Sequence, residues 1–103
     1  MAYQVVWSPT ALADVEAIAS YISRDSTSYA SAVVRKIIHS TRSLEKYPLA
    51  GRMVPEFDDT TIREVFVYSY RIVYRFENDR VTVAAVIHGK RQFTSSFQPE
   101  AQE

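Results

Sequence analysis

A strand pattern in the last third of the chain constrains the fold more than any other feature. Residues 70–76 read Tyr-Arg-Ile-Val-Tyr-Arg-Phe. Successive side chains of a strand point to opposite faces, so alternate aromatic and aliphatic residues share one face while Arg71 and Arg75 share the other. This pattern predicts a strand with one face packed on a core and the other carrying charge.

Two segments of strand-like composition flank residues 70–76. Residues 62–67 precede it and residues 80–88 follow it, each across a short turn. Connections this short join antiparallel strands, so the three segments predict an antiparallel meander. The run 83–87 is apolar at both parities, as expected for a central strand that is covered on both faces.

The first half of the chain predicts a short strand, over residues 3–7, and two helices. Ser8-Pro9 is a helix start, because serine can cap free amide groups and proline at the first position needs no N–H. Apolar spacing carries this helix to about Ser23, and a second helix ends near Tyr47-Pro48. The apolar stripe of the second helix consists of Ala30, Val33, Val34, Ile37, Ile38, Thr41 and Leu44. The short polar break between the helices predicts an antiparallel hairpin.

These elements predict a single α+β domain over residues 1–103. Its order is an N-terminal strand, a two-helix antiparallel hairpin and a three-stranded antiparallel meander, with one sheet packed on the helices. Residues 49–61 contain several breakers and are expected to form a loop. The polar residues 94–103 are expected to be a loose tail.

Composition narrows the function classes. The chain has 12 basic and 12 acidic residues, which argues against a general nucleic-acid coat but permits a local basic face. It has no cysteine, so disulfides, thiolate metal sites and thiol nucleophiles are excluded. Two glycines do not make a phosphate-binding loop. We expect a cytoplasmic protein with no membrane segment, no cofactor and no metal.

The arginines of residues 70–76 are candidate anion ligands. A guanidinium group offers a forked, permanently charged set of donors, so Arg71 and Arg75 could bind phosphate or carboxylate groups. Alternatively, they belong to an ordinary charged strand face and pair with Glu64 or Glu77. Both interpretations stay open from the residues alone.

The segment His88-Gly89-Lys90-Arg91 follows the last predicted strand. His88 could act as a general acid or base near neutral pH, or it could be a hydrogen-bonded structural residue. Gly89 would let the backbone approach a ligand closely. We expect Arg91 to reach the same anion as Arg71, although its direction depends on the turn at Gly89.

Several short motifs in this order resemble the RelE/ParE superfamily of toxins from bacterial type II toxin–antitoxin systems. The resemblance covers about residues 3–93. It rests on Ser8-Pro9, Tyr47-Pro48, Gly51-Arg52, Ile62-Arg63-Glu64, Tyr70-Arg71-Ile72-Val73-Tyr74 and His88-Gly89-Lys90-Arg91. It implies a small α+β toxin, associated with plasmid stabilisation, that forms an oligomer with an antitoxin whose C-terminal segment wraps around it.

The superfamily implies two targets. RelE-like members cut messenger RNA in the ribosomal A site without a metal, whereas ParE-like members poison DNA gyrase. In the ribonuclease branch, Arg71 matches a strand arginine, Arg91 matches the arginine after Gly-Lys, and Arg63 falls near a lysine. The tyrosine of that branch falls at about Phe97, and phenylalanine has no hydroxyl for proton transfer. Glu64 and Val65 stand where a further lysine would help.

The resemblance therefore favours a ParE-like gyrase poison. The alternative is a ribosome-dependent endoribonuclease in which Arg71 and Arg91 stabilise the transition-state charge and His88 transfers the proton. A third reading is a degenerate toxin that mainly binds its antitoxin, and we expect an apolar groove for that partner. The candidate binding residues for the target are Arg63, Arg71, Arg75, Lys90 and Arg91.

Overall fold

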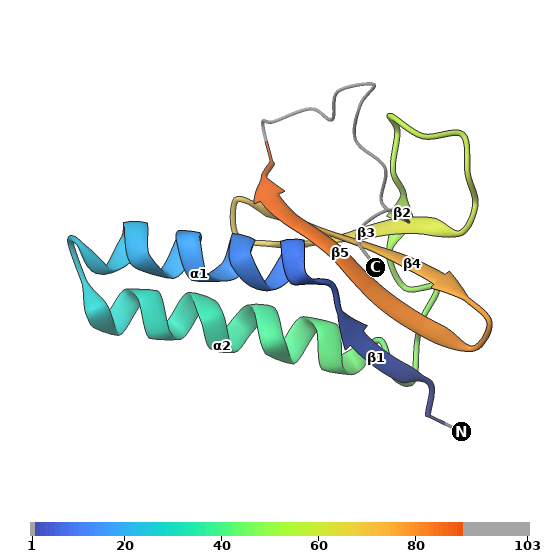
Figure 1. Ribbon diagram of the computed structural model, residues 1–103, viewed down its shortest axis with the longest axis horizontal. Coiled ribbons are helices and arrows are strands. Elements are labelled where there is room, and N and C mark those ends of the chain that lie inside the picture. The colour runs from blue at the N-terminus through green and yellow to red at the C-terminus, as the bar shows by residue number, and fades with distance from the viewer. Residues whose placement is uncertain (1, 90–103) are drawn as a thin grey trace.

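The computed structural model describes residues 2–89, in which two helices lie against a five-stranded sheet (Figure 1). The elements in chain order are β1 (Gln4–Trp7), α1 (Pro9–Ser23), α2 (Thr27–Ser43), β2 (Arg52–Met53), β3 (Ile62–Val67), β4 (Tyr70–Glu77) and β5 (Arg80–His88). The predicted α+β class and element order are confirmed. The predicted tail, residues 94–103, lies outside the described residues.

The sheet has the strand order β1-β5-β4-β3-β2. Strands β3, β4 and β5 form the predicted antiparallel meander. The sheet as a whole is mixed, because β1 pairs with β5 in parallel. Parallel pairing is possible because the chain passes through the helices before it returns to the sheet. The predicted loop over residues 49–61 also contributes the two-residue strand β2 at the edge.

Both helices begin where the sequence predicts a cap. The Ser8 hydroxyl accepts a hydrogen bond from the Ala11 amide at the start of α1, and the Ser26 hydroxyl accepts one from Tyr29 at the start of α2. These side chains satisfy amide groups that a helix leaves without partners in its first turn. Helices α1 and α2 then run side by side as a hairpin (Figure 1).

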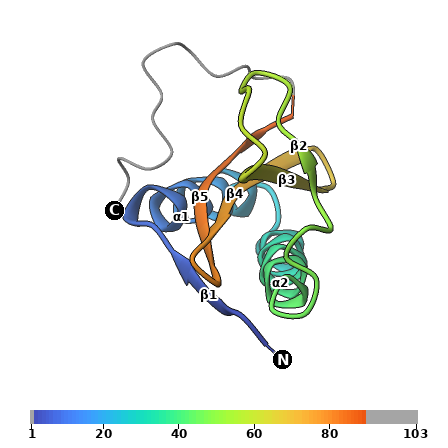
Figure 2. The same ribbon diagram turned by 90° about the vertical axis from the view of Figure 1, so that its right-hand side faces the viewer.

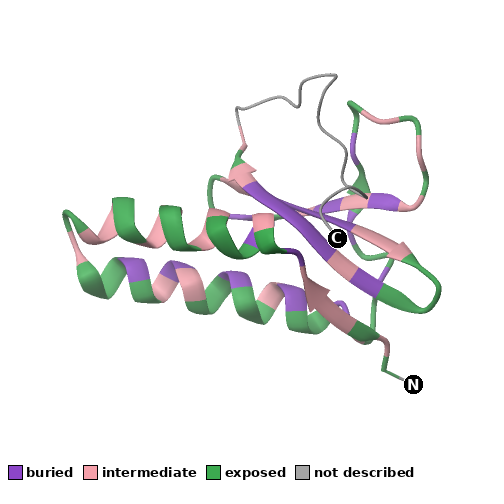
Figure 3. Ribbon diagram, in the orientation of Figure 1, coloured by how far each residue is buried: buried purple, intermediate pink, exposed green. Residues whose placement is uncertain are grey.

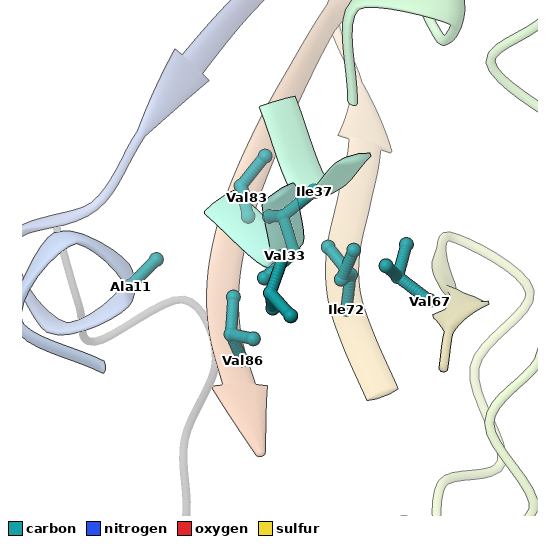
Figure 4. Close-up of a cluster of buried hydrophobic side chains, with 7 residues drawn as sticks. All are labelled: Ala11, Val33, Ile37, Val67, Ile72, Val83 and Val86. Atoms are coloured by element: carbon teal, nitrogen blue, oxygen red, sulfur yellow. The ribbon is translucent and has the colours of Figure 1, made fainter. Parts of the chain in front are cut away.

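The main hydrophobic core lies between the helix hairpin and one face of the sheet. Figure 4 shows its seven buried side chains, which come from both helices and from β3, β4 and β5: Ala11, Val33, Ile37, Val67, Ile72, Val83 and Val86. Burial of this kind contributes roughly 1.5–3 kcal/mol for each large aliphatic side chain. Val33 and Ile37 of the predicted apolar stripe of α2 therefore pack on the sheet, whereas Ile38 of that stripe is 41% exposed.

A β-bulge in β5 explains why residues 83–87 are apolar at both parities. Tyr74 pairs with Val83 and Val73 pairs with Ala85, so Ala84 is an extra residue in the ladder. The start of α1 satisfies the irregular backbone there. Ser8 Oγ donates to the Ala84 carbonyl at 3.0 Å, and the Asp14 carboxylate accepts from the Val86 amide at 2.9 Å.

The second sheet face is also covered. The segment between β2 and β3 lies over it (Figure 2), where Val54, Ile62 and Val73 form a buried cluster with Phe57 beside it. Buried residues consequently run along much of β5 and the adjoining strands (Figure 3). The expectation of an open, charged second face is wrong at its centre, since Arg71 is only 4% exposed.

Candidate functional site

Arg71 forms the centre of a buried ion-pair network on the second sheet face. Its Nε donates to Glu64 Oε1 at 2.6 Å. Its two terminal nitrogens donate to the two oxygens of Glu56, each at 2.8 Å. The guanidinium fork is therefore filled by one carboxylate from β3 and one from the segment before it. This is the bidentate geometry in which arginine binds carboxylates most strongly.

Glu64 binds a second arginine. Its other oxygen accepts from Arg52 Nε at 2.7 Å, and the Glu64 side chain is completely buried. Arg52 is the exposed member of the network, and its guanidinium lies over the Phe66 ring at 5.1 Å. Two arginines thus face two glutamates, so these four side chains carry no net charge. Glu64 lies where the ribonuclease branch would favour another cation.

The network fixes the charge of Arg71. Hydrogen bonds to Glu56, followed by the hydrogen bond and charge of Glu64, raise the pKa of Arg71 above its already high ordinary value, although burial opposes this. An incoming anion would have to displace a carboxylate from this site. The geometry makes Arg71 a clamp between the sheet and the segment that covers it.

Arg75 and Arg63 hold the same covering segment at other points. Arg75 donates to the Thr61 hydroxyl at 2.6 Å and to Asp59 Oδ2 at 3.4 Å. Two hydrogen bonds from Thr61 are the main cause that lowers the pKa of Asp59, and Arg75 adds to the effect. Arg63 donates to the carbonyl oxygens of Thr60 and Gly51. Arg71 and Arg75, the two residues expected to bind anions, are thus both paired with carboxylates of their own chain.

His88 lies on the opposite sheet face from Arg71. It pairs in register with Tyr70 at the end of β5, whereas Arg71 pairs with Ile87. The His88 and Tyr70 rings meet edge to face with centroids 5.9 Å apart, and burial is the main cause that raises the pKa of Tyr70. The structure therefore does not bring His88 and Arg71 to one site.

Two further predicted site residues, Lys90 and Arg91, lie outside the described residues. The proposed sharing of one anion by Arg71 and Arg91 is therefore still a prediction.

The sequence interpretation missed Glu56 as a partner of Arg71. The pairing of Arg71 with Glu64 was one of the two alternatives that alternation on adjacent strands suggested. Glu56 lies in a loop with no periodicity, where only its charge could have pointed to an arginine partner. Arg52 was part of a recognised motif, but nothing in its spacing assigned it to Glu64.

The described part of the chain, residues 2–89, contains neither a candidate metal site nor a candidate membrane-crossing helix. No group of three or more histidine, aspartate or glutamate side chains there is arranged to hold a metal ion. Neither α1 nor α2 combines the length and apolar character that a membrane-crossing helix requires.

Comparisons with known proteins agree with this fold. The family model described as the ParE toxin of the type II toxin–antitoxin system parDE matches residues 5–93. Toxin RelE2 of Caulobacter vibrioides is 35% identical over 89 residues, which cover 85% of this chain and 97% of that protein.

Two solved structures share the fold. The chromosomal ParDE toxin–antitoxin system from P. aeruginosa matches with a TM-score of 0.69 and 17% identity, over 84% of this chain and 95% of that one. The RelBE2 toxin–antitoxin complex from Mycobacterium tuberculosis matches with a TM-score of 0.58 and 22% identity, over 85% of this chain and 99% of that one. On the evidence of the family model and the 35% identical relative, this chain belongs to the ParE toxin family of type II toxin–antitoxin systems.

Proposed function

We propose that this protein is a toxin that poisons DNA gyrase and is neutralised in a stable complex with a cognate antitoxin protein. Its family and the fold that it shares with the ParDE system support the toxin role. The observation that carries the choice of target is the engagement of Arg71 by Glu56 and Glu64. A gyrase poison acts by binding a protein and needs no catalytic cation at this position.

Metal-free RNA cleavage makes demands that the described residues do not meet together. The reaction needs a donor for the charge that develops on phosphorus, and a group that transfers protons to or from the reacting oxygens. Arg71 is the family-matched donor, but two carboxylates already fill its hydrogen-bonding fork. His88 is the candidate for proton transfer, and it lies on the other sheet face.

A ribosome-dependent messenger RNA endoribonuclease is the second candidate. It is favoured by the 35% identity to a relative named Toxin RelE2 and by the exposed position of His88 beside Lys90 and Arg91 in the sequence. A toxin that has lost its target and mainly binds its antitoxin is the third candidate. The second and third candidates both keep the antitoxin-binding role of the first.

Two assays with the purified protein separate the candidates. As a gyrase poison, the protein should inhibit supercoiling by DNA gyrase and leave messenger RNA on purified ribosomes intact. The His88→Ala variant should inhibit gyrase as well as the wild type does, because His88 has no catalytic role in this proposal. Prompt, codon-dependent A-site cuts that vanish in His88→Ala would overturn the proposal in favour of the endoribonuclease. Inactivity in both assays, together with a stable antitoxin complex, would favour the degenerate toxin.

A further inference from the structure

An exposed row of basic residues follows one side of α2 and continues into the turn after it. Arg35, His39, Arg42 and Lys46 recur at i, i+4, i+7 and i+11, and Lys36 lies beside the first of them. All five are exposed. With a rise of about 1.5 Å per helical residue, the row is roughly 16 Å long. We call these five residues the basic ridge.

The ridge residues differ from three arginines on the sheet. Arg52, Arg71 and Arg75 are paired with carboxylates on the sheet. Among the ion pairs of residues 2–89, none involves a ridge residue. Cations near the C-terminus of a helix are favoured by its dipole, which accounts for Arg42 and Lys46. The same effect does not reach Arg35 and Lys36 in the middle of α2.

Charge divides sharply between the two helices of the hairpin. The charged residues of α1 are Asp14 and Glu16, both acidic, whereas those of α2 are Arg35, Lys36 and Arg42, all basic. This contrast occurs in a chain with no net charge. An acidic partner is therefore attracted to α2 and repelled by α1, so the field selects one side of the hairpin.

Two hollows adjoin the ridge. One of about 530 Å³ lies between α1 and α2, with Arg35 at its rim and small side chains such as Ala19 and Ala30 on its walls. The other, of about 390 Å³, lies at the end of α2, and its lining includes His39, Arg42, Lys46 and Tyr47 together with one acidic residue, Glu45. The ridge thus adjoins two open surface hollows whose accessible walls are mostly apolar. Tyr47 is 66% exposed and would be covered by an occupant.

We infer that the basic ridge binds an acidic, amphipathic segment of the antitoxin, with its carboxylates on the ridge and its apolar side chains in the two hollows. This inference rests on the proposed antitoxin partner and names the surface and the chemistry of the contact. A nucleic-acid backbone would match the ridge charges but would leave the hollows empty. Charge complementarity over such a patch speeds association and determines orientation.

Charge reversal on the ridge tests the inference. The probe is the purified cognate antitoxin, taken as the product of the reading frame next to that of the toxin. The dissociation constant of the complex is measured by titration at low and at physiological salt. Arg42→Glu is compared with Arg80→Glu, because Arg80 is also exposed and lies on the sheet face that points away from the helices. Both substitutions change the net charge equally, and circular dichroism of each variant checks that it is folded.

We expect Arg42→Glu to weaken the complex about tenfold at low salt, and Arg35→Glu/Arg42→Glu to weaken it further. Arg80→Glu should bind like the wild type. The loss should shrink as salt screens the charges. An acidic-to-lysine substitution in the antitoxin segment should restore part of the affinity for Arg42→Glu.

Three other outcomes would overturn the inference. If Arg42→Glu and Arg80→Glu both bind like the wild type, the complex exists but does not use the ridge, and the proposed function stands. If the ridge variants lose binding to duplex DNA and keep their affinity for the antitoxin, the ridge belongs to a nucleic acid. If even the wild type forms no complex, the antitoxin proposal fails and this inference fails with it.

Discussion

Glu64 is buried between two arginines, and both of its carboxylate oxygens are used. Taking a carboxylate and a guanidinium group out of water is costly, and mutual attraction and good hydrogen bonds offset that cost only while both partners remain. The network of Arg52, Glu56, Glu64 and Arg71 is thus sensitive to the loss of any one charge. Its role is to hold the segment over the second sheet face.

Replacing Glu64 with glutamine should reveal this dependence. Glu64→Gln keeps the shape of the side chain but leaves the buried Arg71 charge undercompensated, so unfolding free energy should fall by about 3–5 kcal/mol. Urea titration followed by circular dichroism measures the change. The matched control is Glu77→Gln at an exposed position, which should shift stability by less than about 0.5 kcal/mol. Equal transition midpoints for both variants would contradict the role of Glu64.

Tyr74 makes a polar connection between β4 and the loop that joins α2 to β2. Its hydroxyl donates to the Pro48 carbonyl at 2.7 Å and accepts from the Gly51 amide at 3.0 Å, and the residue is fully buried. Tyr74→Phe leaves both backbone groups without this partner and should cost about 1–3 kcal/mol of unfolding free energy. The exposed Tyr47→Phe serves as the control in the same urea titration, and a loss there of similar size would point to an unspecific effect.

The Tyr74 hydroxyl also predicts a loss of stability in alkali. Burial, the largest cause, raises the pKa of Tyr74 above its ordinary value of 10.0. The folded protein therefore binds more protons than the unfolded chain above pH 10, and stability should fall as pH rises from there through the folded pKa. Burial raises the pKa of Tyr70 as well, so Tyr74→Phe should make this fall shallower without abolishing it. The measurement is the melting temperature of the wild type and of Tyr74→Phe at a series of pH values above 10. The same fall in melting temperature with pH in both proteins would contradict the role of the Tyr74 hydroxyl.

At the scale of elements, the start of α1 and the bulge in β5 depend on each other. Strand β1 ends opposite Val83, so the next residues of β5 have no strand partner on that edge. In place of a neighbouring strand, the Ser8 hydroxyl donates to the Ala84 carbonyl and the Asp14 carboxylate accepts from the Val86 amide. Ser8 thereby caps a helix and closes a strand edge with one hydroxyl.

The two helix caps offer a matched comparison. Ser8→Ala removes a cap and also the bond to the buried Ala84 carbonyl, whereas Ser26→Ala removes only the exposed contacts at the start of α2. Loss of a cap costs about 0.5–2 kcal/mol, and a buried carbonyl without its partner adds about 1–3 kcal/mol. Thermal unfolding should therefore show a clearly larger loss for Ser8→Ala. Equal losses would mean that the Ala84 contact contributes nothing.

The predictability of each element follows from its periodicity. Strands β3, β4 and β5 have strong alternation and short turns, and α1 begins at a clear cap, so the sequence predicted their existence and nearly their bounds. The parallel pairing of β1 depends on long-range packing that no local pattern encodes. Strand β2 and the covering segment lack periodicity. For that reason the burial of Arg71 by Glu56 could not be read from the sequence.

On the scale of the whole molecule, neutral net charge conceals two different distributions. Three arginines of the sheet, Arg52, Arg71 and Arg75, are compensated by nearby carboxylates within the folded chain. The basic ridge on α2 has no such compensation among residues 2–89 and is exposed to a partner. These three compensated arginines and the basic ridge therefore lie on different elements, the sheet and α2 with the turn after it.

This separation predicts how the antitoxin changes thermal stability. A ligand that binds only the folded state at about 1,000 times its dissociation constant adds roughly 4 kcal/mol, and each kcal/mol raises the melting temperature of a domain of this size by about 4–8 °C. The complex should therefore melt roughly 15–30 °C above the free toxin. Arg42→Glu should melt only slightly below the wild type when free, because Arg42 makes no ion pair within the described chain and its favourable interaction with the α2 dipole is worth about 0.3–1 kcal/mol.

In the complex, a tenfold weaker affinity lowers the added stability by about 1.4 kcal/mol, so the rise in melting temperature on binding should be roughly 5–10 °C smaller for Arg42→Glu than for the wild type at equal concentrations. Differential scanning calorimetry of the free proteins and of both complexes measures these shifts. Equal rises in melting temperature for the two proteins would show that the ridge does not contribute to binding. A toxin whose melting temperature is unchanged by the antitoxin would contradict the partnership itself.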